Sequence, residues 1–239
     1  YWFERGGDLS PAEFGLRTSA VANIATRTGM DSGRKLQGNA YVGASQFDTL
    51  STAVQISGGS ERYGYFVSAT GLKTNRFLDQ VSLDNLHNGG NAERVFSRFD
   101  YRASPRDVLR LNLMGGQSSF QLANLRSQHA AGQDQRQQFR DWSASTGWLR
   151  TLDAATTLDT TVSYRTSMAW LFGSPFDTPV TADQARRLST FTAGTRLSAL
   201  RGRHNLRMGF DYQRFPVSEN FFFALTGAGL NAPDSEGFN

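Results

Sequence analysis

Residues 205–212 read Asn-Leu-Arg-Met-Gly-Phe-Asp-Tyr, with an apolar side chain at every second position. Successive side chains of a β-strand point to opposite faces, so this stretch predicts a strand with one apolar and one polar face. Eight further segments share the period of two, more weakly in the first three, and bring the predicted number of strands to nine: 36–46, 50–57, 64–75, 95–102, 109–113, 142–148, 158–164 and 191–199. The chain is therefore predicted to be all-β.

The connections between the predicted strands alternate along the chain between short turns and long loops. The short turns are 58–61, 104–107, 151–155 and 201–203, and the long loops are 77–92, 119–137, 171–187 and 216 onward. One hairpin departs from this order by turning tightly at 47–49, where a long loop is due. Outer-membrane barrels have short turns at one end and long loops at the other, whereas a β-sandwich with Greek-key crossings has no reason to keep this order. We expect an antiparallel up-and-down transmembrane β-barrel.

The composition agrees with a wet-lumen barrel and excludes several other classes. Only 38% of the 239 residues are hydrophobic and the mean hydropathy is −0.45, as expected when lipid-facing and lumen-facing residues alternate. No stretch approaches the roughly 20 consecutive apolar residues of a spanning helix. The chain has no cysteine, which excludes disulfides, Cys-ligated zinc and thiol catalysis. Its net charge of +4 is spread along the chain, so no nucleic-acid partner is expected.

Aromatic residues also collect towards the ends of the predicted strands, at Tyr101, Trp148, Trp170, Tyr212 and Phe215. Tyr and Trp favour the headgroup region of a membrane, where the ring is half buried and its polar atom stays wet. The alternative is that these are ordinary core aromatics of a soluble β-protein.

The segment before the first strand carries a family resemblance. It contains Pro11-Ala12-Glu13-Phe14-Gly15, followed by Asn23-Ile24-Ala25-Thr26-Arg27-Thr28-Gly29. Both stretches resemble the end of the plug domain of TonB-dependent receptors, although Ala20 stands where a glycine is common and Ala25 where a larger residue often sits. Stretches such as Asp100-Tyr101-Arg102-Ala103-Ser104 resemble the receptor subgroup that often carries a carboxypeptidase-regulatory-like N-terminal domain.

The resemblance implies the domain organisation and the function. Residues 1–33 would be the C-terminal end of the plug, and 34–239 the N-terminal part of a transmembrane barrel that has 22 strands in such receptors. The intact receptor would lie in the outer membrane, contact lipid, bind TonB through the missing end of the plug, and import a scarce ligand such as a siderophore, cobalamin or a glycan. The alternative is a non-importing pore or adhesion barrel.

We expect the chain to be a piece of a larger barrel. Nine strands cannot close in the up-and-down fashion of bacterial barrels, whose strand number is even, and open edges would leave unpaired backbone groups in lipid. We therefore expect residues 35–215 not to form a stable closed barrel alone. The start of the chain, Tyr1-Trp2-Phe3-Glu4-Arg5-Gly6-Gly7, shows no signal peptide.

The sequence predicts no catalytic, cofactor-binding or metal-binding residue. The histidines His87, His129 and His204 form no local cluster, and a loop site of Asp79, Asp84 and His87 is less favoured than a solvated loop. The glycine-rich stretch 58–64 lacks the Lys-Ser/Thr ending of a phosphate loop and is interpreted as a turn. No G-x-S-x-G elbow occurs, so a barrel enzyme is only a third hypothesis, to be tested by lipase and protease assays.

Arginines and aspartates share the polar faces of the predicted strands: Arg98, Arg102, Arg110, Arg165, Arg196 and Arg207 with Asp100, Asp159 and Asp211. We expect them to pair across neighbouring strands or with the plug. The functional alternative is a cationic path for an anionic ligand such as a metal chelate. Long loops 77–92, 119–137 and 171–187 are expected to contribute to the ligand surface, whose individual residues the sequence does not identify.

Overall fold

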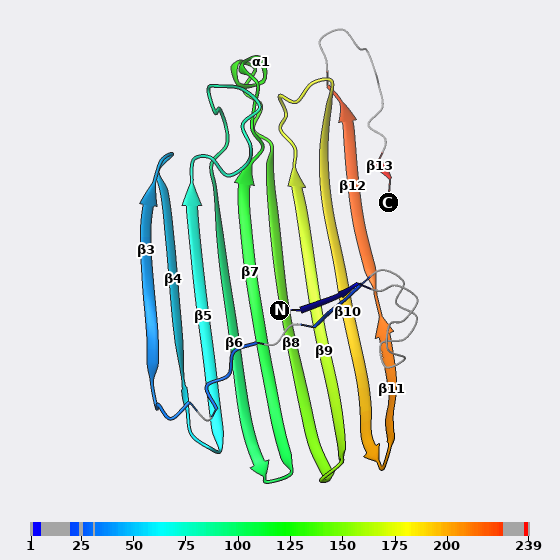
Figure 1. Cartoon of the computed structure of the whole chain (residues 1–239). Coiled ribbons are helices and arrows are strands. Elements are labelled where there is room, and N and C mark those ends of the chain that lie inside the picture. Colours follow the sequence, from blue (N-terminus) through cyan, green and yellow to red (C-terminus); the bar gives the residue numbers. More distant parts are fainter. Residues whose placement is uncertain (1, 6–19, 24–25, 31, 227–236, 239) are drawn as a thin grey trace.

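The described residues of the computed structural model, 2–5, 20–23, 26–30, 32–226 and 237–238, form one large antiparallel sheet and a small separate one (Figure 1). The small sheet pairs β1 (Trp2–Arg5) with β2 (Ala20–Asn23). The large sheet holds eleven strands: β3 (Gln37–Ser45), β4 (Thr49–Gly59), β5 (Tyr63–Thr74), β6 (Gly90–Ser104), β7 (Asp107–Gln121), β8 (Arg136–Asp153), β9 (Thr156–Phe172), β10 (Val180–Arg201), β11 (His204–Arg214), β12 (Val217–Leu225) and β13 (Gly237–Phe238). From β3 to β11 each strand pairs with the next along the chain, as an up-and-down topology requires.

Strand register places the apolar residues of neighbouring strands on one face of the sheet. A continuous row runs from Phe99 through Leu111, Thr146, Val162 and Ala193 to Tyr212, each residue paired with the next across the ladder. Directly paired residues lie on the same face of a sheet. The predicted alternation therefore produces one apolar face that extends across strands β6 to β11.

No second sheet covers this apolar face in the part of the chain that the structure describes. Large apolar side chains on it are open to solvent, such as Val95, 48% exposed, and Phe210, 66% exposed. Among the described residues, only Phe66, Phe120 and Ala199 are buried apolar side chains. A soluble sandwich would bury its apolar rows between two facing sheets, so the alternative of ordinary core aromatics is wrong.

Turn lengths also follow the prediction. The turns β4–β5, β6–β7, β8–β9 and β10–β11 are short and lie at one end of the sheet, whereas the loops 75–89 and 122–135 lie at the other (Figure 1). The predicted tight turn at 47–49 forms at that second end, and Phe47 and Asp48 adopt positive φ angles of 61° and 50° there. The long loop 122–135 contains the helix α1 (Arg126–Ala130).

Two stretches that were predicted as loops are largely strand, so the prediction is wrong there. Residues 180–187, expected within a loop, begin β10, and residues 217–225, expected to be loop, form β12. β12 continues β11 after Pro216, because both strands pair with β10, and the amide of Ser189 still donates to the carbonyl of Pro216. Neither stretch has a period of two: residues 183–187 are largely polar on both faces, and residues 221–223 are three successive phenylalanines. Cross-strand pairs such as Arg186 to Glu219 at 2.7 Å hold this part of the sheet together.

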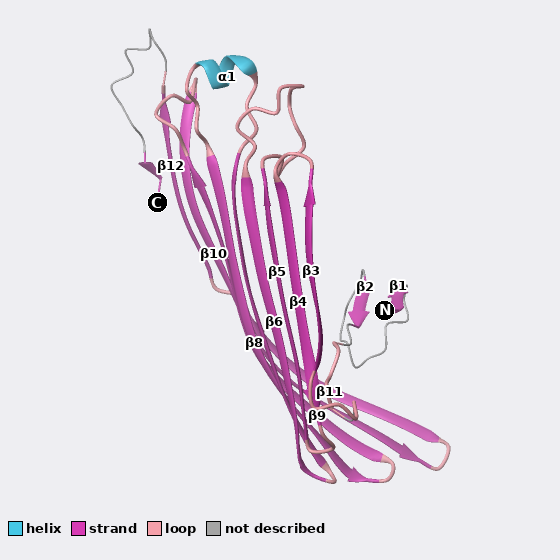
Figure 2. Cartoon of the chain, turned by 90° about the vertical axis from the view of Figure 1, so that its left-hand side faces the viewer, coloured by secondary structure: helices cyan, strands magenta, loops and turns pink. Residues whose placement is uncertain are grey.

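The sheet does not close on itself within the described residues, since β3 pairs only with β4 and β11 only with β10 (Figure 2). All nine predicted strands form. Of the plug-like motifs, 11–15 lies outside the described residues, as do Ile24 and Ala25, while Ala20–Asn23 form β2. No helix in the described part of the chain is long and apolar enough to cross a membrane.

Candidate functional site

The polar face of the sheet carries a charged cluster on β6 and β7. Asp100 pairs across the ladder with Arg110, and its Oδ1 lies 3.7 Å from the Nε of that arginine. Arg98, two residues before Asp100 on the same face, donates from Nε to Oδ2 at 2.8 Å and from Nη2 to Oδ1 at 2.9 Å. The side chain of Asp100 is only 3% exposed. The expected pairing across strands is therefore confirmed at Asp100.

The segment that precedes β3 completes this cluster. Nη1 of Arg98 donates at 2.7 Å to the carbonyl oxygen of Thr26 and at 2.7 Å to its hydroxyl. The hydroxyl of Thr28 donates to Oδ2 of Asp100 at 2.5 Å. We call Arg98, Asp100, Thr26 and Thr28 the Arg98 cluster. The sequence motif at 23–29 contains both threonines, but the sequence did not predict which residues they contact. Their partners lie on the large sheet, which we call the wall.

Glycines bring the same segment into backbone contact with the wall. A Cβ on Gly64 would lie 2.1 Å from the amide nitrogen of Met30, and one on Gly59 would lie 2.8 Å from the carbonyl oxygen of Gly29. A Cβ on Gly29 would itself lie 2.2 Å from the carbonyl oxygen of Gly58. The stretch 58–64 contains the predicted turn, and its glycines also permit this close approach.

A second polar region lies on β9, β10 and β11. Asp159 is paired with Arg196, and Asp211 with Gly194, around a cavity of about 220 Å³ that Gln213 also lines. A Cβ on Gly194 would lie 2.4 Å from Oδ1 of Asp211, so the glycine leaves room for the carboxylate. This mixed-charge lining agrees with the expectation that arginines of the polar face lie opposite aspartates of neighbouring strands.

At the long-loop end, loops 75–89 and 122–135 form one cluster. Asn88, 2% exposed, accepts from the amide of Leu78 and donates to the carbonyl of Leu78, both at 2.8 Å, and also donates to Oδ1 of Asn85 at 2.8 Å. The amide of Asn124 donates to the carbonyl of Leu86 at 3.0 Å and joins the two loops. We call this arrangement the loop cluster.

His87 forms a second connection between these loops. Its Nδ1 lies 2.8 Å from the carbonyl oxygen of Leu122, and its Nε2 lies 2.6 Å from Oδ1 of Asp134. Arg136 binds both carboxylate oxygens of Asp134, and this contact, more than the histidine, lowers the pKa of Asp134. These contacts of Asn88 and Asp134 could not be predicted from the sequence, because several of their partners lie in other parts of the chain.

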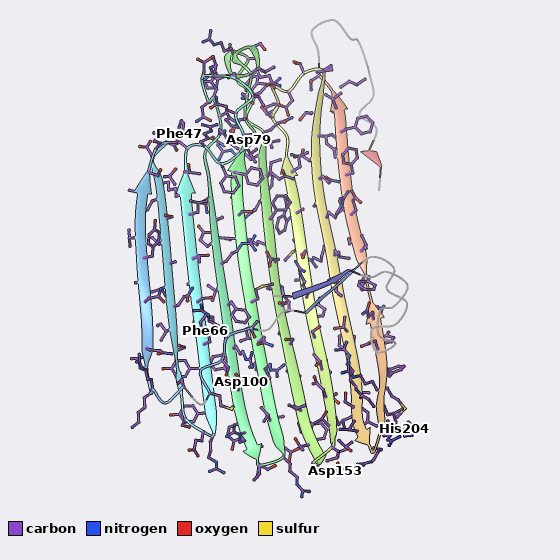
Figure 3. All side chains as sticks on the ribbon, in the orientation of Figure 1. Phe47, Phe66, Asp79, Asp100, Asp153 and His204 are labelled. Atoms are coloured by element: carbon purple, nitrogen blue, oxygen red, sulfur yellow. The ribbon has the colours of Figure 1, made fainter. Side chains whose placement is uncertain are left out.

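The less favoured alternative, a loop metal site of Asp79, Asp84 and His87, is not seen among the described residues. Asp84 binds the guanidinium of Arg126, which lowers the pKa of Asp84, and His87 is held by Asp134. Asp79 lies at the long-loop end and His204 at the short-turn end (Figure 3). Within the residues that the structure describes, no three His, Cys, Asp or Glu side chains are grouped to hold a metal ion.

The third loop, 173–179, is tied to the second. Asp177, 1% exposed, accepts at Oδ2 from the amide of Ser174 and from the side-chain amide of Gln135, each at 2.8 Å. The loops after β5, β7 and β9 are thus joined by hydrogen bonds. A ligand surface built from them would be pre-organised.

Comparison with solved structures supports the fold. The crystal structure of the ferric citrate transporter FecA in its unliganded form matches with a TM-score of 0.61 at 12% identity, over 81% of this chain. This chain covers 30% of the length of FecA. The outer-membrane transporter YddB from Escherichia coli (TM-score 0.37, 13% identity, 74% of this chain and 32% of that one) and the toluene transporter TodX from Pseudomonas putida (0.26, 8%, 81% and 78%) are too distant to support an assignment. No family model and no curated protein matches the sequence.

The open meander, its exposed apolar face and the match to FecA agree with one another. They confirm the predicted all-β, antiparallel fold and the resemblance seen in the sequence. The chain has the fold of part of the structure of the ferric citrate transporter FecA.

Proposed function

We propose that this chain is part of a TonB-dependent receptor that lies in the outer membrane and takes up a scarce ligand. The observation that carries the proposal is the apolar face, which runs from Phe99 to Tyr212 and has no protein cover within the described residues. In a membrane, lipid would cover this face, and the polar face would line a watery lumen. Residues 1–33 would then be the end of the plug.

The loop cluster at the long-loop end is the part of the chain that would face the ligand. Outer-membrane barrels place their longer loops outside the cell. The ligand belongs to the siderophore, cobalamin or glycan class. TonB would act on the plug, at a part of the receptor that precedes this chain.

The test is uptake by cells that produce the intact receptor. Radiolabelled ferric chelates, cobalamin and oligosaccharides are offered to cells with and without a functional TonB system. We expect one of these probes to accumulate only when TonB is present. Uptake that does not depend on TonB would instead establish the diffusion pore, and binding of host surfaces without uptake would establish an adhesion barrel.

A loop exchange tests where the ligand binds. Replacing loops 75–89, 122–135 and 173–179 by short turns is expected to abolish binding of the probe to the intact receptor while the barrel still inserts. Unchanged affinity after this exchange would refute the loops as the ligand surface.

A further inference from the structure

We propose that Arg98, Asp100, Gly59 and Gly64 form an anchor surface that fixes residues 26–30 to the barrel wall. The chain that precedes Thr26 could then move while Thr26 stays in place. Residues 26–33 would remain attached to the wall. This inference rests on the proposed function, because it presumes a plug that moves relative to the barrel. It sets the mechanical boundary of the plug eight residues earlier than the boundary after Gly33 that the sequence predicts.

The hydrogen bonds of the Arg98 cluster depend on one another. Arg98 directs two of its donors to Asp100 and a third to Thr26, so each partner orients the guanidinium for the other. Asp100 accepts from Thr28 as well as from Arg98. Charge-assisted hydrogen bonds are short and strong, particularly where little water reaches them, and the carboxylate here is 3% exposed. Separation of the segment from the wall would break three of these contacts together.

Shape supports the same conclusion. Gly64 and Gly59 provide a surface without side chains, against which the backbone of Gly29 and Met30 lies in direct contact. Phe66, directly opposite Arg98 in the register, is only 9% exposed although it belongs to the polar face. It lines one cavity together with Arg27 and Thr28. The ring of Phe66 lies 6.1 Å from that of Phe96, so the segment and Phe96 both lie beside this apolar side chain.

The described strand that precedes Thr26, β2, is held differently. Among the described strands, β2 (Ala20–Asn23) hydrogen-bonds only to β1, and both lie apart from the large sheet (Figure 2). Past Gly33, the amide of Gly59 donates to the carbonyl of Arg34 at 3.0 Å, and β3 begins at Gln37. Within the described residues, Thr26 is the first that contacts the wall.

The experiment is to pull on the N-terminal end of the intact receptor, held in a membrane by its barrel, and to measure the extension before the barrel unfolds. In the wild type we expect the extension to stop at Thr26. Asp100→Asn removes the charge of the cluster, and we expect eight more residues to be released, which adds about 28 Å to the extension. A wild-type extension that already includes residues 26–33 would overturn the proposal.

Two milder variants guard against a barrel that fails to fold. Gly64→Ala places a methyl group 2.1 Å from the amide nitrogen of Met30, and Thr28→Val removes one donor, while both keep the Arg98–Asp100 pair. Each is expected to release the segment at a lower force than the wild type. Gly115→Ala is the matched control, since its Cβ would meet no atom closer than 4.0 Å. Equal release force in all four proteins would also overturn the proposal. Because the readout is mechanical, uptake that proves independent of TonB would remove the proposed function without deciding the anchor.

Discussion

The imidazole of His87 lies against the carboxylate of Asp134, with Nε2 2.6 Å from Oδ1. Its other ring nitrogen faces the carbonyl oxygen of Leu122 at 2.8 Å. Leu122 begins loop 122–135 and Asp134 lies near its end, whereas His87 belongs to loop 75–89. The imidazole of His87 therefore connects the two loops through both of its ring nitrogens.

This geometry predicts that His87 holds loops 75–89 and 122–135 together. His87→Ala removes both ring contacts, the one to Leu122 and the one to Asp134. We expect protease cleavage within these loops to become about three- to tenfold faster, a modest effect because Asp134 is half exposed.

Two further variants make that prediction specific. His87→Gln keeps a side-chain donor, and we expect its cleavage rate to lie between those of the wild type and His87→Ala. His129→Ala, in helix α1, should behave as the wild type. Equal cleavage rates in all four proteins would show that His87 does not hold the loops together.

Asn88 is predicted to hold loop 75–89 in shape. Asn88→Ala leaves the amide and the carbonyl of Leu78 without their side-chain partner, and each buried unpaired group costs about 1–3 kcal/mol. We expect proteolysis of this loop to be at least about tenfold faster, because 1.4 kcal/mol corresponds to a factor of ten. Asn39→Ala, at an exposed position of β3, serves as control and should change nothing.

The two faces of β9 are predicted to respond oppositely to a charge. Val162 belongs to the apolar row and Thr161 to the polar face, at the cavity of Asp159 and Asp211. In lipid vesicles, Val162→Arg should lower the free energy of unfolding of the intact barrel by about 2–4 kcal/mol, as at a lipid-facing midplane site. Thr161→Arg should leave it nearly unchanged. Equal losses in urea unfolding would mean that both faces meet the same solvent.

The short turn after β8 offers a further pH prediction. Arg201, at the end of β10, donates to both oxygens of Asp153 and lowers the pKa of Asp153 far below its usual range. A lowered pKa means that the contact is complete above the ordinary carboxylate range and is lost only as the pH falls through the lower value. Carboxyl NMR in detergent should show Asp153 still ionised at pH 4, and Arg201→Gln should raise the midpoint. A midpoint near 4 in the wild type would contradict the contact.

The start of β10 and the whole of β12 were predicted as loop, within 171–187 and from 216 onward. Strand prediction relied on a period of two, and neither stretch has one. Residues 183–187 are largely polar on both faces, whereas residues 221–223 are three successive phenylalanines that occupy both faces. Cross-strand pairs such as Arg186 with Glu219 hold this part of the ladder and leave no periodic pattern in the sequence.

The sequence by itself determined the fold class and the up-and-down order of the strands, because the side-chain period and the length of each connection are local properties of the chain. It also supplied the resemblance to plug and barrel. Only the tertiary structure decided that Thr26 meets Arg98, that His87 meets Asp134, and how far β10 extends. These contacts join residues far apart in the chain, and their free energy depends on distances that no local pattern records.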